Sequence, residues 1–387
     1  LNAIVGSVGV PGGYCPAPHV SLPEPEPLPP STVECPQGAR LVERLLRGEG
    51  SVGLYMTVLA NPAYSWPNSE AFRRALQDEG RVPYLVSIDT NLTETSMLAD
   101  LVLPAATYLE SWGLESPPAQ ELVPFVTLRQ PVVPPRGEAL TVDDILLTLG
   151  TRLGGDSPGF FPFPTVESYV DAVVSRVPGL SEAGGLSLLR EQGVWYNLSA
   201  APQHRPGPDG FATSTGRLEI GPLRGDGPTA GAVARSGSDG SDSGDLVLVT
   251  YRHNVHFGDY SANCWWLAEI AHENALLMNP DTARRRGIQQ GQRVRVTSAV
   301  GSSEARVRVT HGIHPQVVAL ATGFGHEAVG RVARGKRFKS GDPMTLYLWW
   351  DGHSNGVNPT ALLSSRIEEP GGGLVWVDTR VSVEALG

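Results

Sequence analysis

The feature that most constrains the fold is an alternation of strand and helix patterns between Arg40 and about Gly154. The residues predict strands at 53–59, 84–88 and 101–104, with helices at 41–46 and 69–77 interspersed. The short apolar run Tyr84–Ile88 is typical of a strand that helices cover on both faces of a parallel sheet. We therefore predict an α/β fold with a doubly wound parallel sheet.

Polar residues follow the predicted strands where a ligand would bind. Asp89 ends the strand at 84–88, and the loop Ala60–Ser65 follows the strand before it. Ligands of open α/β sheets lie outside the carboxyl ends of the strands, where a carboxylate accepts from ribose hydroxyls or guanine N–H groups. The run Thr93–Thr95 predicts a capped helix N-terminus that attracts phosphate. A capped turn without a ligand is the alternative interpretation.

The rest of the chain predicts a different architecture. Helices are expected at 142–153 and 166–174, and residues 225–244 are almost entirely small or polar, as in a flexible linker. Short β-branched runs follow at 246–250, 293–298, 304–310 and 317–320, which favours a compact barrel. The predicted organisation is a Pro-rich connecting segment (1–39), an α/β domain with a helical extension (40–224), the linker (225–244) and the barrel (245–387).

Composition excludes several classes of protein. A net charge of −10 argues against sequence-independent binding of nucleic acid, and no apolar run is long enough for a membrane span. Three cysteines, Cys15, Cys35 and Cys264, are too few to hold an iron–sulfur cluster. Cys15 and Cys35 form either a disulfide or two free thiols. Because the chain starts at Leu1 without an initiator Met, we expect it to be a piece of something longer.

The order of several motifs resembles one enzyme family. The segments are Leu1–Gly13, Asn61-Pro62 with Ser65, Thr93–Pro104, Ser214–Glu219, Asn279–Ala283 and Gly287–Ser298. Together they resemble the C-terminal half of the catalytic subunit of molybdopterin oxidoreductases of the dimethyl sulfoxide reductase family. Four further motifs are most similar to its polysulfide, thiosulfate and tetrathionate reductase branch: Tyr108–Glu110, Leu128–Pro134, Gly323–His326 and Asn355–Asn358.

The resemblance implies a fold and a cofactor. The α/β part would bind molybdopterin guanine dinucleotide, and residues 245–387 would form a six-stranded double-psi β-barrel that covers the pterins. The cofactor would be bis-molybdopterin guanine dinucleotide with molybdenum or tungsten. The family's metal ligand and its [4Fe-4S] cluster belong to the N-terminal half, so we predict neither a catalytic residue nor a metal ligand in this chain.

The resemblance also implies site residues, by position. One nucleotide end would contact Asn61, Ser65, Asp89, Thr93, Glu94, Thr95 and Asp100, with Asp89 or Asp100 accepting from guanine. Pterin and phosphate would contact Thr250, Arg252, His253 and His256. Further candidates are Asn279, His326, Asn355 and Asn358; a turn role is the alternative for Asn279 and Asn355.

The implied function is reduction or oxidation of an inorganic sulfur compound, namely polysulfide, thiosulfate or tetrathionate, in anaerobic respiration. The implied partners are the N-terminal half of the same subunit, as missing sequence or as a separate chain, a quinone-reactive membrane anchor and an iron–sulfur electron-transfer subunit. The implied location is the periplasmic or exported side of the cytoplasmic membrane, with membrane association through these partners. The alternative is a non-catalytic scaffold subunit of a respiratory complex that has kept the molybdopterin fold.

Overall fold

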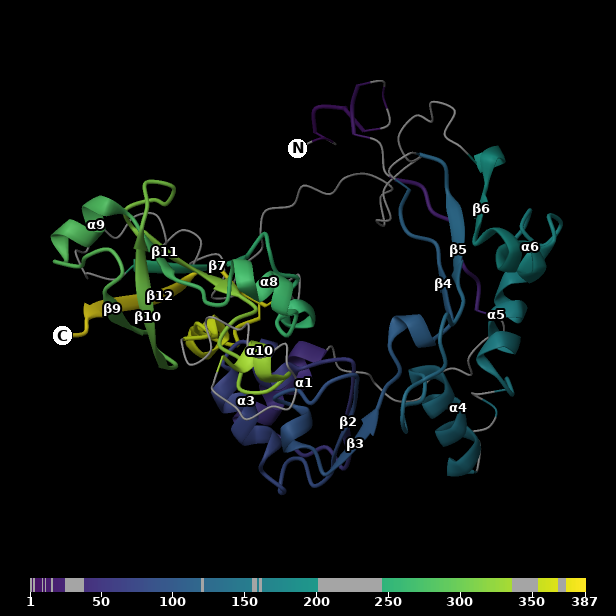
Figure 1. Cartoon of the computed structure of the whole chain (residues 1–387), viewed down its shortest axis with the longest axis horizontal. Coiled ribbons are helices and arrows are strands. Elements are labelled where there is room, and N and C mark those ends of the chain that lie inside the picture. Colours follow the sequence, from purple (N-terminus) through teal and green to yellow (C-terminus); the bar gives the residue numbers. More distant parts are fainter. Residues whose placement is uncertain are drawn as a thin grey trace. The chain divides into compact units, whose positions relative to one another are not determined.

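The chain divides into two compact units, each built from two stretches of sequence. The computed structural model describes residues 2, 4–8, 10, 12–14, 17–24, 38–119, 122–154, 159, 162–200, 246–335, 354–367 and 374–387. Unit 1 combines residues 1–34 with 104–224, and unit 2 combines residues 35–103 with 225–387 (Figure 1). The predicted linker at 225–244 and the motif Ser214–Glu219 lie outside the described residues, as do Cys15 and Cys35.

The first part of unit 2 is a small α/β layer. Its elements are α1 (Gly38–Arg47), β1 (Tyr55–Val58), α2 (Pro62–Ser65), α3 (Ser69–Leu76), β2 (Leu85–Asp89), the 3₁₀ turn η1 (Ser96–Leu98) and β3 (Leu101–Pro104). The sheet order is β1-β2-β3, and β1 pairs with β2 in parallel. The first four residues of β2 are buried, and Leu85 packs in one cluster with Leu45 and Phe72. The predicted parallel sheet is therefore confirmed.

The second part of unit 2 is a closed six-stranded barrel. Its strands are β7 (Leu246–Arg252), β8 (Leu276–Met278), β9 (Arg293–Thr297), β10 (Ser302–Val309), β11 (Val317–Thr322) and β12 (Thr379–Ala385), closed in the order β10-β8-β11-β7-β12-β9. The pairs β7–β11 and β8–β10 are parallel, so crossover connections rather than hairpins join them. This arrangement confirms the predicted six-stranded barrel.

Alternation of side chains builds the barrel core. In β9, Val294 and Val296 are buried, and the three residues around them are exposed. Leu248 of β7, Leu276 of β8 and Leu320 of β11 are also fully buried, and they pack in the same cluster as these valines. Short helical segments lie between the strands: η5 (Gly258–Ser261), α8 (Trp265–Ile270), α9 (Pro280–Arg285), α10 (Arg331–Arg334) and η7 (Pro359–Leu362).

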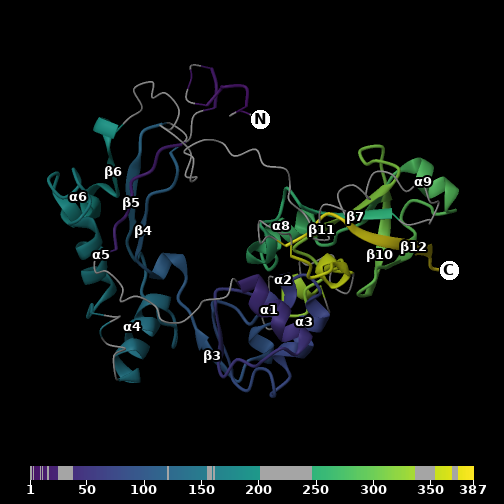
Figure 2. The ribbon, with the colours of Figure 1, turned by 180° about the vertical axis from the view of Figure 1, so that it is seen from behind.

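Unit 1 contains an antiparallel sheet that the sequence patterns did not predict. Its strands are β4 (Gly113–Glu115), β5 (Phe125–Arg129) and β6 (Val194–Tyr196), in the order β4-β5-β6. The 3₁₀ turn η2 (Tyr108–Glu110) precedes β4, and η4 (Leu198–Ala200) follows β6. Helices α5 (Val166–Val174) and α6 (Gly185–Gln192) lie on one side of this sheet in both views (Figures 1 and 2).

The two helices predicted in this region are confirmed. Helix α4 spans Val142–Leu153, and the Thr141 hydroxyl accepts from the backbone N–H of Asp144 at its start. Thr165 caps α5 in the same way, through Ser168 N–H. Such caps satisfy N–H groups that have no partner inside the helix.

The observed units divide the chain differently from the predicted domain boundaries. Residues 104–224 group with 1–34 in unit 1, whereas the sequence patterns placed 40–224 in a single domain. The physical reason is that residues 38–103 pack with the barrel, through contacts described below. Among the described residues, the structure contains no helix long and apolar enough to cross a membrane.

Replacing Leu248 with Ala is expected to destabilise unit 2 by about 2–5 kcal/mol, because the side chain is fully buried in the barrel and its removal leaves a cavity. Urea unfolding of the full chain, followed by circular dichroism, measures the change. The control is Leu92→Ala, because Leu92 is 58% exposed in the same unit. An equal loss in both variants would contradict the assignment of Leu248 to the core.

Candidate cofactor site

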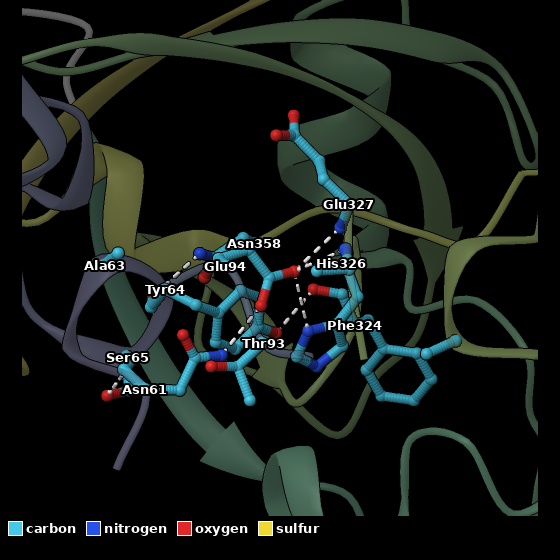
Figure 3. Close-up of polar contacts among 12 residues, drawn as sticks. Asn61, Ala63, Tyr64, Ser65, Thr93, Glu94, Phe324, His326, Glu327 and Asn358 are labelled. Carbon is cyan, nitrogen blue, oxygen red and sulfur yellow. Dashed lines mark hydrogen bonds and ion pairs between the residues drawn. The ribbon is translucent and has the colours of Figure 1, made fainter. Parts of the chain in front are cut away.

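A buried carboxylate joins the two sequence segments of unit 2. Glu94 Oε1 accepts from His326 Nδ1 at 3.1 Å, from Glu327 N–H at 2.8 Å and from Ala328 N–H at 3.0 Å. Glu94 Oε2 accepts from Asn61 Nδ2 at 2.7 Å. We call Asn61, Glu94, Thr95, His326 and the two backbone N–H groups the Glu94 network. Figure 3 shows Glu94 between Asn61 and the barrel loop that carries His326 and Glu327.

Asn61 extends this network within the α/β layer. Its Oδ1 accepts from both the backbone N–H and the hydroxyl of Thr95, each at 3.0 Å. The Thr95 hydroxyl in turn accepts from Ala63 N–H. The loops after β1 and β2 are therefore fixed to each other by side chains that the sequence assigned to ligand binding.

Glu94 is ionised in this environment. Burial by itself raises the pKa of Glu94, but the hydrogen bond and charge of His326, together with the bond from Asn61, lower that pKa to about 2. A carboxylate that accepts several hydrogen bonds remains charged for this reason. Because protein donors reach both of its oxygens, the geometry gives Glu94 a structural role in holding the site together.

Tyr64 connects the same two segments. Its ring stacks on His326 with 3.8 Å between ring centroids, and its hydroxyl donates to Phe324 O at 2.6 Å. The backbone oxygen of Tyr64 accepts from Asn358 Nδ2 and from the Thr360 hydroxyl. Burial, with the nearby charges of Asp259 and Glu94, raises the pKa of Tyr64, so its hydroxyl stays a donor.

The first pocket lies beside this network at the carboxyl ends of β1 and β2. Its volume is about 270 Å³, and we call it the Asp89 pocket. It is lined by Leu59, Ala60, Asn61, Ser65, Asp89, Thr90, Asn91, Thr93, Asp259, Tyr260 and Val329. Burial raises the pKa of Asp89, and the charge of Asp259 raises it further. Two carboxylates that share a small pocket favour a ligand that presents N–H or O–H donors.

The second pocket adjoins the first, because Ser65, Asp259 and Tyr260 line both. Its volume is about 440 Å³, and we call it the Arg252 pocket. Its remaining lining residues are Tyr64, Thr250, Tyr251, Arg252, Phe257, Gly258, Thr322, Gly323, Asn358, Thr360 and Trp376.

The Arg252 pocket has the donors that a phosphate group needs. Arg252 offers a planar set of N–H donors, and Thr250 offers a hydroxyl. The Thr360 hydroxyl already donates to Tyr64 O, and the Thr322 hydroxyl lies 3.5 Å from Tyr251 O. Gly323 has φ +87°, and a Cβ built on it would meet the backbone of Gly258 at 3.2 Å. Only glycine leaves this wall of the pocket undistorted.

The structure brings together most of the predicted site residues. Asn61, Ser65, Asp89 and Thr93 line the first pocket, and Thr250, Arg252 and Asn358 line the second. Glu94, Thr95 and His326 lie in the Glu94 network. His256 and Asn355 line a third, much smaller cavity next to His326.

Three predicted residues lie outside these pockets. Asp100 accepts from Leu85 N–H, at the start of β2 and therefore at the end opposite Asp89. Asn279 begins α9, where it accepts from Asp281 N–H and donates to Ile313 O, which is the turn role given as its alternative. His253 Nδ1 accepts from Val255 N–H, and burial lowers the pKa of His253.

The predicted helix N-terminus after Thr95 is wrong. The segment forms only the three-residue 3₁₀ turn η1, and the Thr93 hydroxyl accepts from Ser96 N–H. The reason is that hydroxyls and Asn61 use the local N–H groups and fix the chain in a tight turn. A turn of this length has no dipole comparable with that of a full helix.

The sequence patterns missed two residues that border both pockets. Asp259 and Tyr260 belong to η5, and Tyr260 is 77% exposed. The sequence feature that could have indicated them is that the segment after β7 is rich in aromatic and polar residues. Only the tertiary structure places this segment at the same pocket as Asp89. Among the described residues, no group of three or more His, Cys, Asp or Glu side chains forms a metal-binding cluster.

Comparison with known proteins assigns the family. Residues 2–152 match the family described as "Molybdopterin oxidoreductase", and residues 246–359 match the "Molydopterin dinucleotide binding domain". The chain belongs to the molybdopterin oxidoreductase family. The two matches meet in unit 2, since one covers its α/β layer and the other covers most of its barrel.

The curated relatives are considerably longer than this chain. It is 27% identical over 64% of its length to the molybdopterin-containing subunit of thiosulfate reductase from Salmonella typhimurium, and 24% identical over 71% to one of the subunits of tetrathionate reductase from that organism. It spans 35% and 33% of those two proteins. It is also 24% identical over 92% of its length to the molybdopterin-binding-like subunit of menaquinone reductase from Nitratidesulfovibrio vulgaris, of which it spans 49%.

A solved structure has the same fold. The chain matches acetylene hydratase from Pelobacter acetylenicus with a TM-score of 0.61 at 16% identity, over 89% of this chain and 46% of that one. The two matched domains identify the cofactor of this family member as bis-molybdopterin guanine dinucleotide with molybdenum or tungsten. The adjoining pockets fit a dinucleotide, because one offers carboxylate acceptors and the other offers an arginine and a hydroxyl.

Replacing Glu94 with Gln is expected to remove stability that depends on pH. The pKa of Glu94 is lowered from 4.5 to about 2 in the folded state, so the charged form contributes about 3 kcal/mol above pH 4.5. This contribution is lost as the pH falls from 4.5 towards about 2 in the native protein. Chemical unfolding at a series of pH values measures it; the variant should lack that part of the pH dependence.

The matched control is Glu327→Gln, one residue beyond His326. The Glu327 side chain is 63% exposed and pairs with Arg73 at the surface, so its loss should cost less than about 1 kcal/mol. If both variants showed the same acid profile as the native protein, the buried carboxylate would not be a stabilising group.

Proposed function

We propose that this chain is the cofactor-binding portion of a molybdenum or tungsten bis-pterin oxidoreductase that acts on an inorganic sulfur compound. The observation that carries the proposal is a pair of adjoining pockets that differ in charge: Asp89 lines only the first, Arg252 lines only the second, and Asp259 lines both. In the Asp89 pocket, Asp89 and Asp259 are acceptors that suit the N–H groups of guanine. In the Arg252 pocket, Arg252 and the Thr250 hydroxyl are donors that suit phosphate oxygens.

The pocket chemistry supports one orientation for the nucleotide. The residues that line the Asp89 pocket include two carboxylates and no cation, so this pocket would repel a phosphate group. The Arg252 pocket shares Asp259 but adds the Arg252 guanidinium, which attracts phosphate. The guanosine end therefore belongs in the Asp89 pocket, with the phosphates towards Arg252. Ser65, which lines both pockets, would contact the nucleotide between these two parts.

The bound metal centre would supply two-electron transfer, and the protein supplies binding and orientation. In this chain, Asp89 and Arg252 would bind the cofactor, and the Glu94 network holds their loops in place. The Tyr64 hydroxyl stays protonated and fixes the carbonyl of Phe324, next to Gly323 at the wall of the Arg252 pocket. We place no catalytic residue in this chain.

The proposed substrate is thiosulfate, tetrathionate or polysulfide. This rests on the similarity to the thiosulfate and tetrathionate reductase subunits. Both are named as subunits, which supports an assembly of several subunits. The partners that we propose are a quinone-reactive membrane anchor and an iron–sulfur electron-transfer subunit. An N-terminal half would carry the metal ligand and the [4Fe-4S] cluster, and the assembly would face the periplasmic or exported side of the membrane.

A second candidate is a non-catalytic scaffold subunit. It is favoured by the similarity over 92% of the chain to a menaquinone reductase subunit that is named molybdopterin-binding-like. A scaffold does not need the charge pattern of the two pockets, so the presence of Asp89, Asp259 and Arg252 there favours the enzyme.

Elemental analysis of the purified assembly that contains this chain is expected to show molybdenum or tungsten, with about two guanine nucleotides released per metal atom, as the bis form requires. The same preparation should oxidise a reduced viologen dye when thiosulfate, tetrathionate or polysulfide is added, with nitrate as the sulfur-free control. Absence of both metal and nucleotide would favour the scaffold. Metal with activity on nitrate alone would overturn only the substrate class.

Replacing Asp89 with Asn is expected to lower the retention of guanine nucleotide at least tenfold, because a charge-assisted hydrogen bond of about 1.5–3 kcal/mol is lost. Nucleotide released by acid from equal amounts of protein, after gel filtration, measures the change. The control is Asp100→Asn, since an amide oxygen can still accept from Leu85 N–H away from both pockets. Equal losses in the two variants would contradict the role of Asp89.

A further inference from the structure

His326 has one ring nitrogen without a partner. The side chain is 1% exposed, its Nδ1 bonds Glu94, and its Nε2 is buried without a hydrogen-bond partner among the described residues. A carboxylate only accepts, so Nδ1 carries the proton of the Glu94 bond. In the neutral ring Nε2 is then an acceptor, and leaving a buried acceptor unsatisfied costs stability.

A small cavity borders the same ring. Its volume is about 10 Å³, close to the minimum for a single water molecule. His326 borders this cavity, and its Nε2 is the ring nitrogen that has no partner among the described residues. The other lining residues are His256, Ala262, Ala268, Ala271, His272, Gly323, Phe324, Val332, Ala333 and Asn355.

We propose that this cavity binds one water molecule, which hydrogen-bonds His326 Nε2. Asn355 is a second partner, because its Nδ2 already donates to His326 O and Ala333 O, which leaves Oδ1 to accept. Water can either donate or accept, so it satisfies Nε2 whether the imidazole is neutral or protonated. Neither ring nitrogen of His256 is open to it, since Nδ1 contacts the Ser261 hydroxyl and Nε2 contacts Ala271 O.

The water completes the contacts of a loop that borders both pockets. Gly323 lines the Arg252 pocket and Val329 lines the Asp89 pocket, and between them His326 is held by Glu94 at its Nδ1 edge and by Tyr64 across its face. The charged and titratable groups around His326 are Glu94, Tyr64, His256 and His272, with the surface pair Glu327–Arg73 beyond. His326 and its water are thus a positioning element for the two pockets.

Val329 gives a second reason to expect that contacts fix the conformation of this loop. It is a β-branched residue at φ +70°, a left-handed conformation that such residues rarely adopt. Its N–H donates to Leu92 O, which holds the strained turn against the loop after β2. Contacts on both sides of the turn, from Glu94 and from Leu92, are what keep this conformation populated.

A crystal structure of the full protein with its cofactor, at a resolution that shows ordered water, tests the proposal directly. We expect one water within hydrogen-bond distance of His326 Nε2 and of Asn355 Oδ1. An empty cavity, or a protein atom bonded to Nε2, would overturn the proposal. This result does not depend on the proposed function, because the water is observed whatever the pockets bind.

The effect on the pockets rests on the proposed function and is tested with variants. In His326→Asn the amide NH₂ can replace Nδ1 and donate to Glu94, but nothing replaces Nε2; in His326→Leu both bonds are lost. We expect nucleotide retention to fall less than tenfold in the first variant and more than tenfold in the second. The control is His311→Asn, at an exposed histidine of the same unit.

The outcomes separate the two proposals. If the native protein retains no guanine nucleotide, the proposed function fails while the water is still decided by the crystal structure. If nucleotide is retained equally by the native protein and both variants, His326 does not position the pockets. A crystal structure of His326→Asn in which the Glu94 bond persists and the water is absent would confirm that Nε2 holds it.

Discussion

The buried carboxylate of Glu94 is the interaction on which the geometry of unit 2 depends. It accepts four hydrogen bonds, one from Asn61 in the α/β layer and three from His326, Glu327 and Ala328 in the barrel. Residues 94 and 326 are 232 positions apart in the sequence, so this ionised group fixes a long-range contact. Removing it would leave several buried donors unsatisfied at once, which is costly in a low-dielectric interior.

The two pockets follow from this contact. Asp89 comes from the α/β layer and Asp259 from the barrel, and they share a pocket because the Glu94 network and the contacts of Tyr64 hold the two segments together. Asp89 lines one pocket and Arg252 the next, and this difference in charge would orient a molecule that has a donor-rich base at one end and phosphate at the other. The shape of both pockets therefore depends on interactions that lie outside them.

Sequence reasoning predicted the elements with strong local patterns. Helices α4 and α5 and strands β2, β3, β7, β9, β10 and β11 lie within a few residues of their predicted positions. Strands β4, β6 and β8 were missed because each has only three residues. Such segments are strands through pairing with distant neighbours, since a run of three residues has no periodicity to detect. The longer strands β5 and β12 were missed as well.

The candidate site was predicted as a set of residues, and the structure shows where they lie. Asp89 and Arg252 line pockets, whereas Asp100 lies at the opposite end of β2 and Asn279 caps the start of a helix. The sequence by itself determined the family, the α/β and barrel classes and the acceptor at the end of β2, because these depend on local pattern and motif order. Only the tertiary structure decided that Glu94 and His326 bind each other and that Asp259 faces Asp89. Those pairings depend on how distant segments pack, which no local pattern encodes.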